Sequence, residues 1–352
     1  MTGQPDNADT TPVREGFHFD EARLGAWLAE HVEAFAGSLQ VTQFKGGQSN
    51  PTFQLTTPSR SYVLRRQPAG QLLKGAHAVD REARVMSALA SVGFPVPRVY
   101  ALCRDPDVLG SMFFVMDKVS GRIFWDASFS ALPRAERARY QDAMNDTLAR
   151  LHSVDVDAVG LRDFGRPDNY MSRQIDRWSK QYLDDPETGR NRDMDAVIEW
   201  LQARVPSQHD VSIIHGDFRV DNMIFHPELP QVVAVLDWEL STLGDPIADF
   251  AYHLMMYRLP PRITGGLAGV DLAAQGLLDE EEYIRRYCRR TGRDHIEDVR
   301  FYLVFNLFRF ASILHGIKGR IRRGTAASAS AELSSNFDFV AEEAARVANA
   351  AG

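Results

Sequence analysis

The stretch that decides the fold is Ile213–Phe225, which reads IIHGDFRVDNMIF. A short apolar run leads into a polar loop, and a second apolar run, Met223–Phe225, leaves it. The loop carries Asp217 and, five residues later, Asn222. Short apolar runs bounded by turn residues are typical of buried strands. The sequence therefore predicts two strands that hold an acid and an amide on the loop between them.

A third polar side chain arrives in the same way. The apolar run Val232–Leu236 delivers Asp237, which lies 15 residues after Asn222. Hard oxygen donors of this kind suit Mg²⁺, which takes a few protein oxygens together with the phosphate oxygens of a substrate. If Asn222 and Asp237 hold the metal, Asp217 is left to accept the proton of a hydroxyl. The alternative is a capped turn with a surface acid and no chemistry.

An acid, an asparagine five residues on and a second acid after the next hairpin form the constellation of protein-kinase-type phosphotransfer. The His215-Gly216-Asp217 version, with Asp237-Trp238-Glu239 downstream, resembles the aminoglycoside phosphotransferase and choline kinase family. The resemblance implies an α+β, two-lobed protein-kinase-like fold, with a small β-rich N-lobe and a larger, mainly helical C-lobe. It implies ATP and Mg²⁺ as cofactors, Asp217 as the base, His215 as support for the loop, and Asn222 and Asp237 as metal ligands.

The predicted N-lobe offers matching nucleotide contacts. Residues 61–66 are predicted as a strand and sit where a kinase strand carries Ala-x-Lys. Side chains two apart share a strand face, so Val63 would cover the adenine while Arg65 reaches the phosphates as a catalytic cation. The family often has lysine there, and arginine is an able phosphate ligand but not a neutral exchange. Glu82, on the predicted helix Asp80–Ser91, is the expected partner of Arg65, with an ordinary surface pair as the alternative.

Two further segments complete the predicted nucleotide site. The turn 46–50 would cover the phosphates with its backbone N–H groups. It lacks a G-x-G-x-x-G pattern, and a plain hairpin turn is the alternative. On the predicted strand 112–119, Met116 would border the adenine, and the backbone of Asp117 and Val119 would bond its edge. The cofactor-binding residues of the turn are Gly46, Gly47, Ser49 and Asn50.

The change from strand to helix patterns divides the chain near residue 120. We expect a disordered tail over residues 1–16, an N-terminal ATP-binding lobe over 17–120, and a C-terminal catalytic and acceptor-binding lobe over 121–352. Besides 61–66 and 112–119, strands are predicted at 39–45, 52–56 and 98–103, and helices at 19–35, 133–152, 170–183, 193–204, 279–291, 295–318 and 328–348.

A narrower resemblance covers most of residues 40–335. The segments Arg65–Leu73, Ala76–Glu82 and Val235–Pro246, with residues 301–330, look like the kinase-like domains that animals carry fused to acyl-CoA dehydrogenases. This resemblance implies a hydroxyl on an acyl-CoA-like molecule as the acceptor. An aminoglycoside acceptor is a polycation and would instead need an acidic pocket.

Composition excludes several function classes. Lys and Arg number 40 against 47 Asp and Glu, and the net charge of −7 argues against a nucleic-acid binder. Cys103 and Cys288 are too few for a disulfide framework or a cysteine zinc site, so a reducing compartment fits. With a polar N-terminus that lacks a signal-peptide core, this predicts a cytoplasmic protein. The apolar stretch 301–317 carries Asn306 and Arg309, which predicts a buried helix and no membrane contact.

The sequence therefore predicts an ATP- and Mg²⁺-dependent phosphotransferase with a small-molecule hydroxyl as acceptor. Two alternatives stay open beside an aminoglycoside kinase. A nucleotide-binding module without transfer activity is allowed by Arg65 and the altered turn. A protein kinase would need an activation segment after Asp237, which is not recognisable. Asp163-Phe164-Gly165 spells the kinase metal motif but precedes Asp217, so we interpret it as a coincidence in a loop.

Overall fold

The computed structural model describes residues 10–45, 50–68, 78–207, 210–324 and 330–350. The chain divides into two compact units. Unit 1 comprises residues 1–123, 156–164 and 221–241, and unit 2 comprises residues 124–155, 165–220 and 242–352. The first division lies close to the predicted lobe boundary. The sequence did not predict that the two later segments, 156–164 and 221–241, belong to unit 1.

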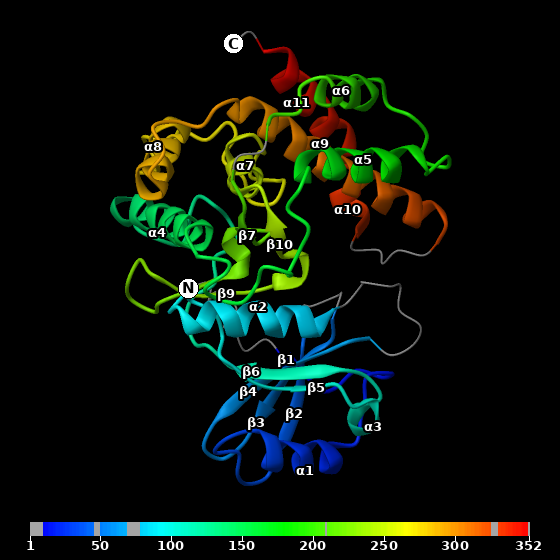
Figure 1. Ribbon diagram of the computed structural model, residues 1–352, viewed down its shortest axis with the longest axis vertical. Helices are drawn as coiled ribbons and strands as arrows, with labels where there is room; N and C mark the ends of the chain where they lie inside the picture. Colours follow the sequence, from blue (N-terminus) through cyan, green and yellow to red (C-terminus); the bar gives the residue numbers. More distant parts are fainter. Residues whose placement is uncertain (1–9, 46–49, 69–77, 208–209, 325–329, 351–352) are drawn as a thin grey trace. The chain divides into compact units, whose positions relative to one another are not determined.

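Unit 1 is built on a six-stranded antiparallel sheet in the order β1–β2–β3–β4–β6–β5 (Figure 1). Alternate residues of its strands, such as Tyr62 and Leu64, are fully buried on one face of the sheet. The bounds of β2 to β6 agree with the predicted strands to within two residues. The strands are β1 (Thr10–Thr11), β2 (Gln40–Phe44), β3 (Thr52–Thr56), β4 (Ser61–Arg66), β5 (Val99–Cys103) and β6 (Phe113–Asp117).

Two helices lie on opposite faces of this sheet (Figure 1). Helix α1 (Glu21–His31) begins after Asp20, whose carboxylate accepts the Arg23 N–H at 2.9 Å. Its buried Leu24 and Leu28 pack with the strand residues of the core. Helix α2 (Val79–Ser91) contacts β5 and β6 and brings Glu82 into the unit. A one-turn helix, α3 (Pro106–Leu109), contacts α1.

Part of the predicted disordered tail is a strand. Residues 10 and 11 pair with Phe44 and Gln43 at the edge of the sheet. The backbone groups of an edge strand are open to an added segment, and β1 satisfies some of them. The prediction for residues 1–16 is therefore wrong for residues 10 and 11, and residues 1–9 lie outside the described residues.

A two-stranded sheet in unit 1 carries both predicted metal ligands. Strand β8 (Met223–Phe225) pairs antiparallel with β9 (Val232–Val235). The 3-10 turns η1 (Val220–Asn222) and η2 (Trp238–Leu240) lie at the same end of this hairpin. Gly121 allows the chain to approach β8, because a Cβ there would lie 2.2 Å from the carbonyl oxygen of the last β8 residue.

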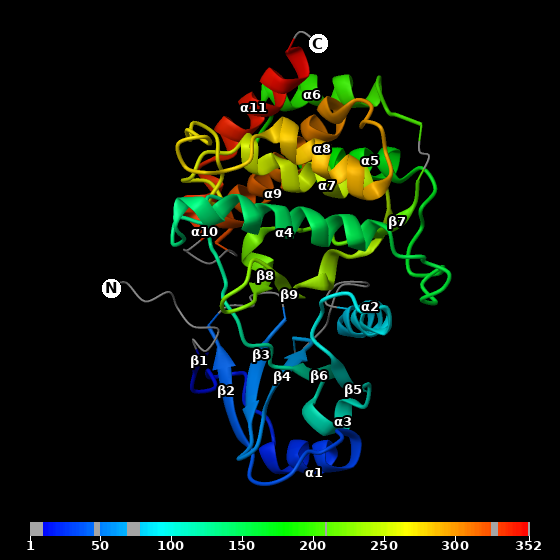
Figure 2. The ribbon, with the colours of Figure 1, turned by 90° about the vertical axis from the view of Figure 1, so that its left-hand side faces the viewer.

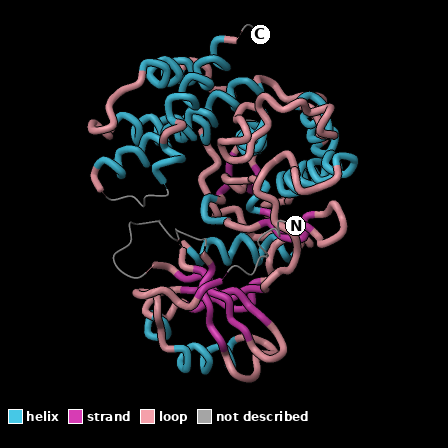
Figure 3. Tube along the Cα trace, turned by 180° about the vertical axis from the view of Figure 1, so that it is seen from behind, coloured by secondary structure: helices cyan, strands magenta, loops and turns pink. Residues whose placement is uncertain are grey.

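Unit 2 is mainly helical, whereas most of the strand lies in unit 1 (Figure 3). Its central element is α9, which contacts α5, α6, α7, α10 and α11 (Figure 2). No helix within the described ranges has both the length and the apolar composition that a membrane span requires. The elements are α4 (Arg134–His152), α5 (Tyr170–Leu183), α6 (Arg192–Gln202), β7 (Ser212–Ile214), β10 (Thr242–Gly244), α7 (Pro246–Leu254), η3 (Met255–Tyr257), α8 (Glu280–Thr291), α9 (Val299–Arg322), α10 (Ser330–Ser334) and α11 (Phe337–Asn349).

The last two helices differ from the prediction. We expected one helix over 328–348, but α10 ends at Ser334 and α11 begins at Phe337. The side chain of Asn336 donates to the carbonyls of Glu332 and Leu333 at 3.3 and 3.2 Å. Asparagine competes in this way for backbone groups that a continuous helix would use.

Candidate active site

One cation in unit 1 is shared by three carboxylates. Arg65 on β4 places Nε 2.8 Å from Oε2 of Glu82 and Nη2 2.7 Å from Oδ1 of Asp237. The same Nη2 lies 3.5 Å from Oε2 of Glu239. Asn50 donates from Nδ2 to Glu82 at 3.1 Å and to Glu239 at 3.5 Å, so it links two of the acids. We call these five residues the Arg65 cluster.

Burial makes the charges of the Arg65 cluster interact strongly. The side chain of Glu82 is 2% exposed and that of Arg65 is 12% exposed. Burial raises the pKa of Glu82 to about 7, against the opposing charge of Arg65. Burial would lower the pKa of Arg65, but the three nearby carboxylates raise it instead. The cluster therefore holds more acid than one arginine neutralises, which is an environment that attracts a further cation.

The predicted metal ligands lie at one end of the β8–β9 hairpin. The N–H of Leu236 donates to the carbonyl of Asn222 at 2.8 Å, directly before Asp237. Asp237 has φ +65° and ψ +61°, a left-handed conformation that aspartate adopts more readily than most residues other than glycine and asparagine. No three His, Cys, Asp or Glu of the described chain form a metal cage. One amide and one carboxylate fit Mg²⁺, which takes its other oxygens from phosphates and water.

Two of the predicted adenine contacts, Val63 and Met116, lie on the sheet face of Arg65. Val63 and Met116 are paired across β4 and β6 and are 8% and 9% exposed. The N–H of Asp117 donates to the carbonyl of Arg98 at 2.9 Å, so of its two backbone groups only the carbonyl suits the predicted bond to adenine. Val119 lies two residues beyond the end of β6. Nucleotide contacts of these residues stay predictions.

The predicted phosphate-covering turn is described at one residue only. Gly46, Gly47 and Ser49 lie outside the described residues. Asn50 is fully buried, and its side chain bonds Glu82 within the Arg65 cluster. The prediction gave Asn50 a backbone contact with phosphate, whereas the structure shows a side chain that fixes a carboxylate.

In unit 2, the loop that carries Asp217 is held by Asp249 of α7. The Oδ2 of Asp249 accepts the His215 N–H at 2.7 Å, and Oδ1 accepts the Gly216 N–H at 2.8 Å. The ring of His152 lies 3.3 Å from Oδ2. Gly216 has φ +83°, a conformation that glycine adopts without strain. His215 also accepts the Asp217 N–H at 3.2 Å.

The charge of Asp249 is favoured by these contacts. Burial alone would raise the pKa of Asp249, but hydrogen bonding and charge from His152 and the contacts of His215 lower it.

Helix α7 begins next to the loop because Asp245 caps it, accepting the Ile247 N–H at 2.8 Å, with proline at the first helical position.

The carboxylate of Asp217 has two partners that the sequence reasoning missed. The hydroxyl of Tyr252 donates to its Oδ1, and Nε of Arg219 lies 3.2 Å from the same oxygen. Arg219 stands two residues after Asp217 in the loop, and Tyr252 lies three residues, one helical turn, after Asp249. Helical spacing from Asp249 was the signal that could have identified Tyr252. The role of Glu239 was missed although its motif had been recognised.

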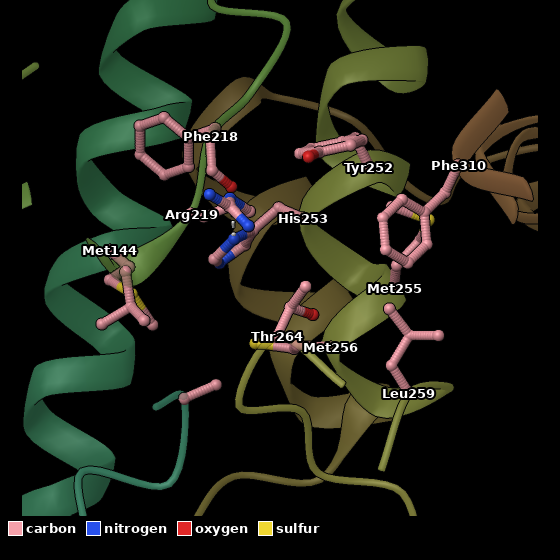
Figure 4. A pocket seen from close by; sticks show the side chains of 12 residues that line it. Met144, Phe218, Arg219, Tyr252, His253, Met255, Met256, Leu259, Thr264 and Phe310 are labelled. Atoms are coloured by element: carbon pink, nitrogen blue, oxygen red, sulfur yellow. Dashed lines mark hydrogen bonds between the residues drawn. The ribbon is translucent and has the colours of Figure 1, made fainter. Parts of the chain in front are cut away.

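A cavity of about 50 Å³ lies in unit 2 beside this acid (Figure 4). Tyr252 and Arg219, which contact Asp217, both belong to its wall. In Figure 4 the hydroxyl of Tyr252 points toward the loop that carries Phe218 and Arg219. No acidic residue is among the described residues that line it. The large apolar side chains of the wall are Met144, Phe218, Met255, Met256, Leu259 and Phe310.

The sequence pattern of the phosphotransferase enzyme family matches residues 40–297. The chain belongs to this family. It is 41% identical over 351 residues to acyl-CoA dehydrogenase family member 10 of Mus musculus, in a match that covers 96% of this chain and 33% of that protein. The phosphotransferase chain thus spans about a third of the length of this curated relative.

Solved structures agree with the family. A Ralstonia eutropha JMP134 protein, provisionally named an aminoglycoside phosphotransferase, matches with a TM-score of 0.87 and 46% identity over 94% of this chain and 98% of that one. The aminoglycoside phosphotransferase APH(4)-Ia, in a ternary complex with AMP-PNP and hygromycin B, matches with a TM-score of 0.61 and 15% identity over 91% and 98%. This second likeness shows the fold alone.

These comparisons confirm the family resemblance, the protein-kinase-like fold and the enzyme class of a small-molecule kinase. They also confirm the narrower resemblance to the acyl-CoA dehydrogenase fusions. The roles of the individual site residues stay predictions, and the structure supplies the geometry on which they can be argued.

Proposed function

We propose that this phosphotransferase moves the γ-phosphoryl group of ATP to a hydroxyl of a small molecule, with Mg²⁺ held by Asn222 and Asp237. The observation that carries the proposal is the Arg65 cluster. A buried cation paired with a helix carboxylate, next to the acid that follows the next hairpin, supports the proposal because kinase-type phosphoryl transfer uses a cation–glutamate pair and a metal-binding acid. When bound, Mg²⁺ supplies neutralisation of the negative charge on the phosphate oxygens.

The residues of this chain position the substrates and hold one proton. Arg65 contacts the phosphates of the nucleotide. The acceptor oxygen forms a bond to the γ-phosphorus, the bond from that phosphorus to the β–γ bridging oxygen breaks, and ADP leaves with the electron pair. Asp217 takes the hydroxyl proton, and its loop is kept in place by Asp249. Positioning and electrostatic stabilisation account for most of the rate enhancement in this class of reaction.

For the acceptor we propose a hydroxyacyl-CoA-like molecule rather than an aminoglycoside. The cavity beside Asp217 has a largely apolar wall, and its described lining residues include Arg219 but no acid. A polycation would find no counter-charge on this wall. A short aliphatic segment next to a hydroxyl would pack against its apolar side chains. The cavity volume of about 50 Å³ is small for an acyl chain. The three methionines of the wall allow it to widen.

The test compares Asp217→Asn with Asp163→Asn. Thermal melting with ATP and Mg²⁺ reports nucleotide binding, and ADP release over panels of hydroxyacyl-CoAs and aminoglycosides reports transfer. We expect Asp217→Asn to keep the ATP-induced rise in melting temperature and to lose about 10²- to 10⁴-fold in turnover, the usual contribution of a general base. Asp163 is largely exposed and belongs to the motif interpreted as a coincidence, so Asp163→Asn should behave as wild type.

Each alternative has its own signature in this experiment. ATP-dependent stabilisation without turnover on any panel member would support a nucleotide-binding module. Turnover on aminoglycosides alone would contradict the proposed acceptor. Phosphate incorporation into peptides would favour a protein kinase. Retained turnover in Asp217→Asn would remove Asp217 from the role of base.

A further inference from the structure

Helix α7 contacts the catalytic loop through two residues one turn apart. Asp249 accepts the backbone N–H groups of His215 and Gly216. Tyr252, three residues later on the same face, donates its hydroxyl to Oδ1 of Asp217. One rigid element therefore sets both the backbone of the loop and the side chain of its acid.

A cation from α9 fixes the ring of Tyr252. The guanidinium of Arg309 lies 5.0 Å from the centroid of the Tyr252 ring and 5.6 Å from that of Trp178. Its Nη2 donates to the carbonyl of Gly216 at 2.7 Å. A planar guanidinium between aromatic rings holds a defined orientation. The ring of Tyr252 and the catalytic loop are thus joined through one side chain.

The hydroxyl of Tyr252 acts as a donor toward Asp217. Burial, followed by the negative charge of Asp217, raises the pKa of Tyr252, so its phenol is protonated at neutral pH. A protonated phenol beside a carboxylate favours the ionised carboxylate. The titratable and charged groups that surround this pair in unit 2 are Arg219 and His215 on the loop, Asp249 on α7 and Arg309 on α9.

We propose that Tyr252 is a positioning residue for the base: its hydroxyl, oriented by Arg309, holds Oδ1 of Asp217 so that the carboxylate keeps one orientation toward the acceptor. Tyr252 also lines the cavity beside Asp217. A group of the acceptor in that cavity therefore contacts the residue that orients the base. This inference rests on the proposed function.

The experiment measures kcat, KM and their pH dependence for Tyr252→Phe, which keeps the ring and removes the hydroxyl. Loss of a hydrogen bond to a charged group should lower kcat about ten- to a hundredfold. The KM for ATP should stay unchanged. Because the carboxylate of Asp217 loses a donor, the acidic limb of the pH profile of turnover should move to higher pH.

The matched control is Tyr257→Phe. Tyr257 is also a buried tyrosine close in sequence to α7, but its hydroxyl donates to the carbonyl of Leu278 at 3.0 Å. Its loss should change neither kcat nor the pH profile. If Tyr252→Phe fails to fold, judged by its melting curve, Arg309→Lys replaces it. Lysine keeps the charge and loses the planar stacking, so the pH profile should move in the same direction by a smaller amount.

A wild-type pH profile in Tyr252→Phe overturns the inference even if kcat falls, because a merely structural role would lower kcat without moving the profile. If Tyr252→Phe does not fold and Arg309→Lys is tested in its place, a wild-type pH profile in Arg309→Lys overturns the inference as well. The two proposals fail separately. If Asp217→Asn loses turnover and Tyr252→Phe keeps both the rate and the profile, only the role of Tyr252 is wrong. If Asp217→Asn keeps turnover, the proposed function itself fails.

Discussion

The carboxylates of the Arg65 cluster and the carboxylate of Asp249 are held in opposite ways. In the cluster, one guanidinium faces three acids. At Asp249, one acid faces two backbone N–H groups and the ring of His152. The three carboxylates of the cluster carry more negative charge than one guanidinium neutralises, so the cluster can pair with a bound cation. Asp249 is saturated by donors of its own chain. The cluster in unit 1 is thus held by charge, and the loop in unit 2 is held by hydrogen bonds.

The largest loss of stability is expected when the carboxylate of Asp249 is replaced. Asp249→Asn replaces an ionised acceptor with an amide that can accept through one oxygen only. We expect the free energy of unfolding at pH 7 to fall by about 3–5 kcal/mol, since one or two buried donors lose their acceptor and the buried carboxylate charge is removed. Urea denaturation measures this change. Because the pKa of Asp249 is lowered from its usual 3.8, this stabilisation is present above that pH and is lost as pH falls through the lower folded value.

The control for this change is Asp163→Asn, whose carboxylate is 77% exposed and pairs with Arg84. Its urea midpoint should not move. A wild-type midpoint in Asp249→Asn would contradict the view that Asp249 is the fixed support of the loop.

A smaller loss of stability is expected when Arg65, the cation shared by the Arg65 cluster, is removed. Arg65→Met leaves three carboxylates without their partner, two of them partly exposed to water. At pH 8 we expect a loss of about 2–3 kcal/mol in unfolding free energy, below the range for a fully buried pair. At pH 5 the loss should shrink, because Glu82 is then protonated. The rise in melting temperature with ATP and Mg²⁺ should disappear.

Arg84→Met is the matched variant, because Arg84, on α2 of the same unit, is also paired with an aspartate, but in an exposed pair. It should leave both the urea midpoint and the ATP-induced stabilisation as in wild type. If Arg65→Met and Arg84→Met show the same urea midpoint and the same ATP-induced stabilisation, burial does not make the Arg65 pairs stronger than the exposed Arg84 pair.

The smallest effect concerns the proton held by Glu82. Its pKa of about 7 in the folded protein lies above the ordinary 4.5, so the native state binds more protons than the unfolded state between these values. Stability should therefore fall as pH rises from about 4.5 to 7. We expect about 1–2 kcal/mol, because the proton is shared among coupled acids. Glu82→Gln should flatten this slope in urea midpoints measured at pH 5 and 7.5. An unchanged slope would assign the proton to another group.

Asp163 and Asp237 both belong to motifs that resemble a kinase metal site, and their order along the chain distinguishes them. Asp163 belongs to a motif with the letters of the kinase metal site, and Asp237 belongs to a looser one. Both pair with an arginine in unit 1. Chain order alone selected Asp237, because a metal ligand of this constellation follows the base. The structure adds that Asp237 joins a buried cluster, whereas Asp163 lies on an exposed loop.

Local patterns predicted most of the elements. The strands at 52–56 and 61–66 and the helix at 170–183 have the predicted bounds, because their apolar residues repeat with the period of the element. Side-chain competition for backbone groups was harder to foresee, as at Asn336 between α10 and α11. The edge strand at residues 10 and 11 was missed because its polar residues form a strand only by pairing with β2.

By itself, the sequence determined the family, the fold class and the candidate residues Arg65, Glu82, Asp217, Asn222 and Asp237, because motif spacing and element periodicity are local properties of a chain. Only the tertiary structure decided that Asn50 and Glu239 join the Arg65 cluster, and that Tyr252 holds Asp217. These contacts link residues 32 to 189 positions apart. No local pattern records such a distance, because the packing of whole helices and sheets brings those side chains together.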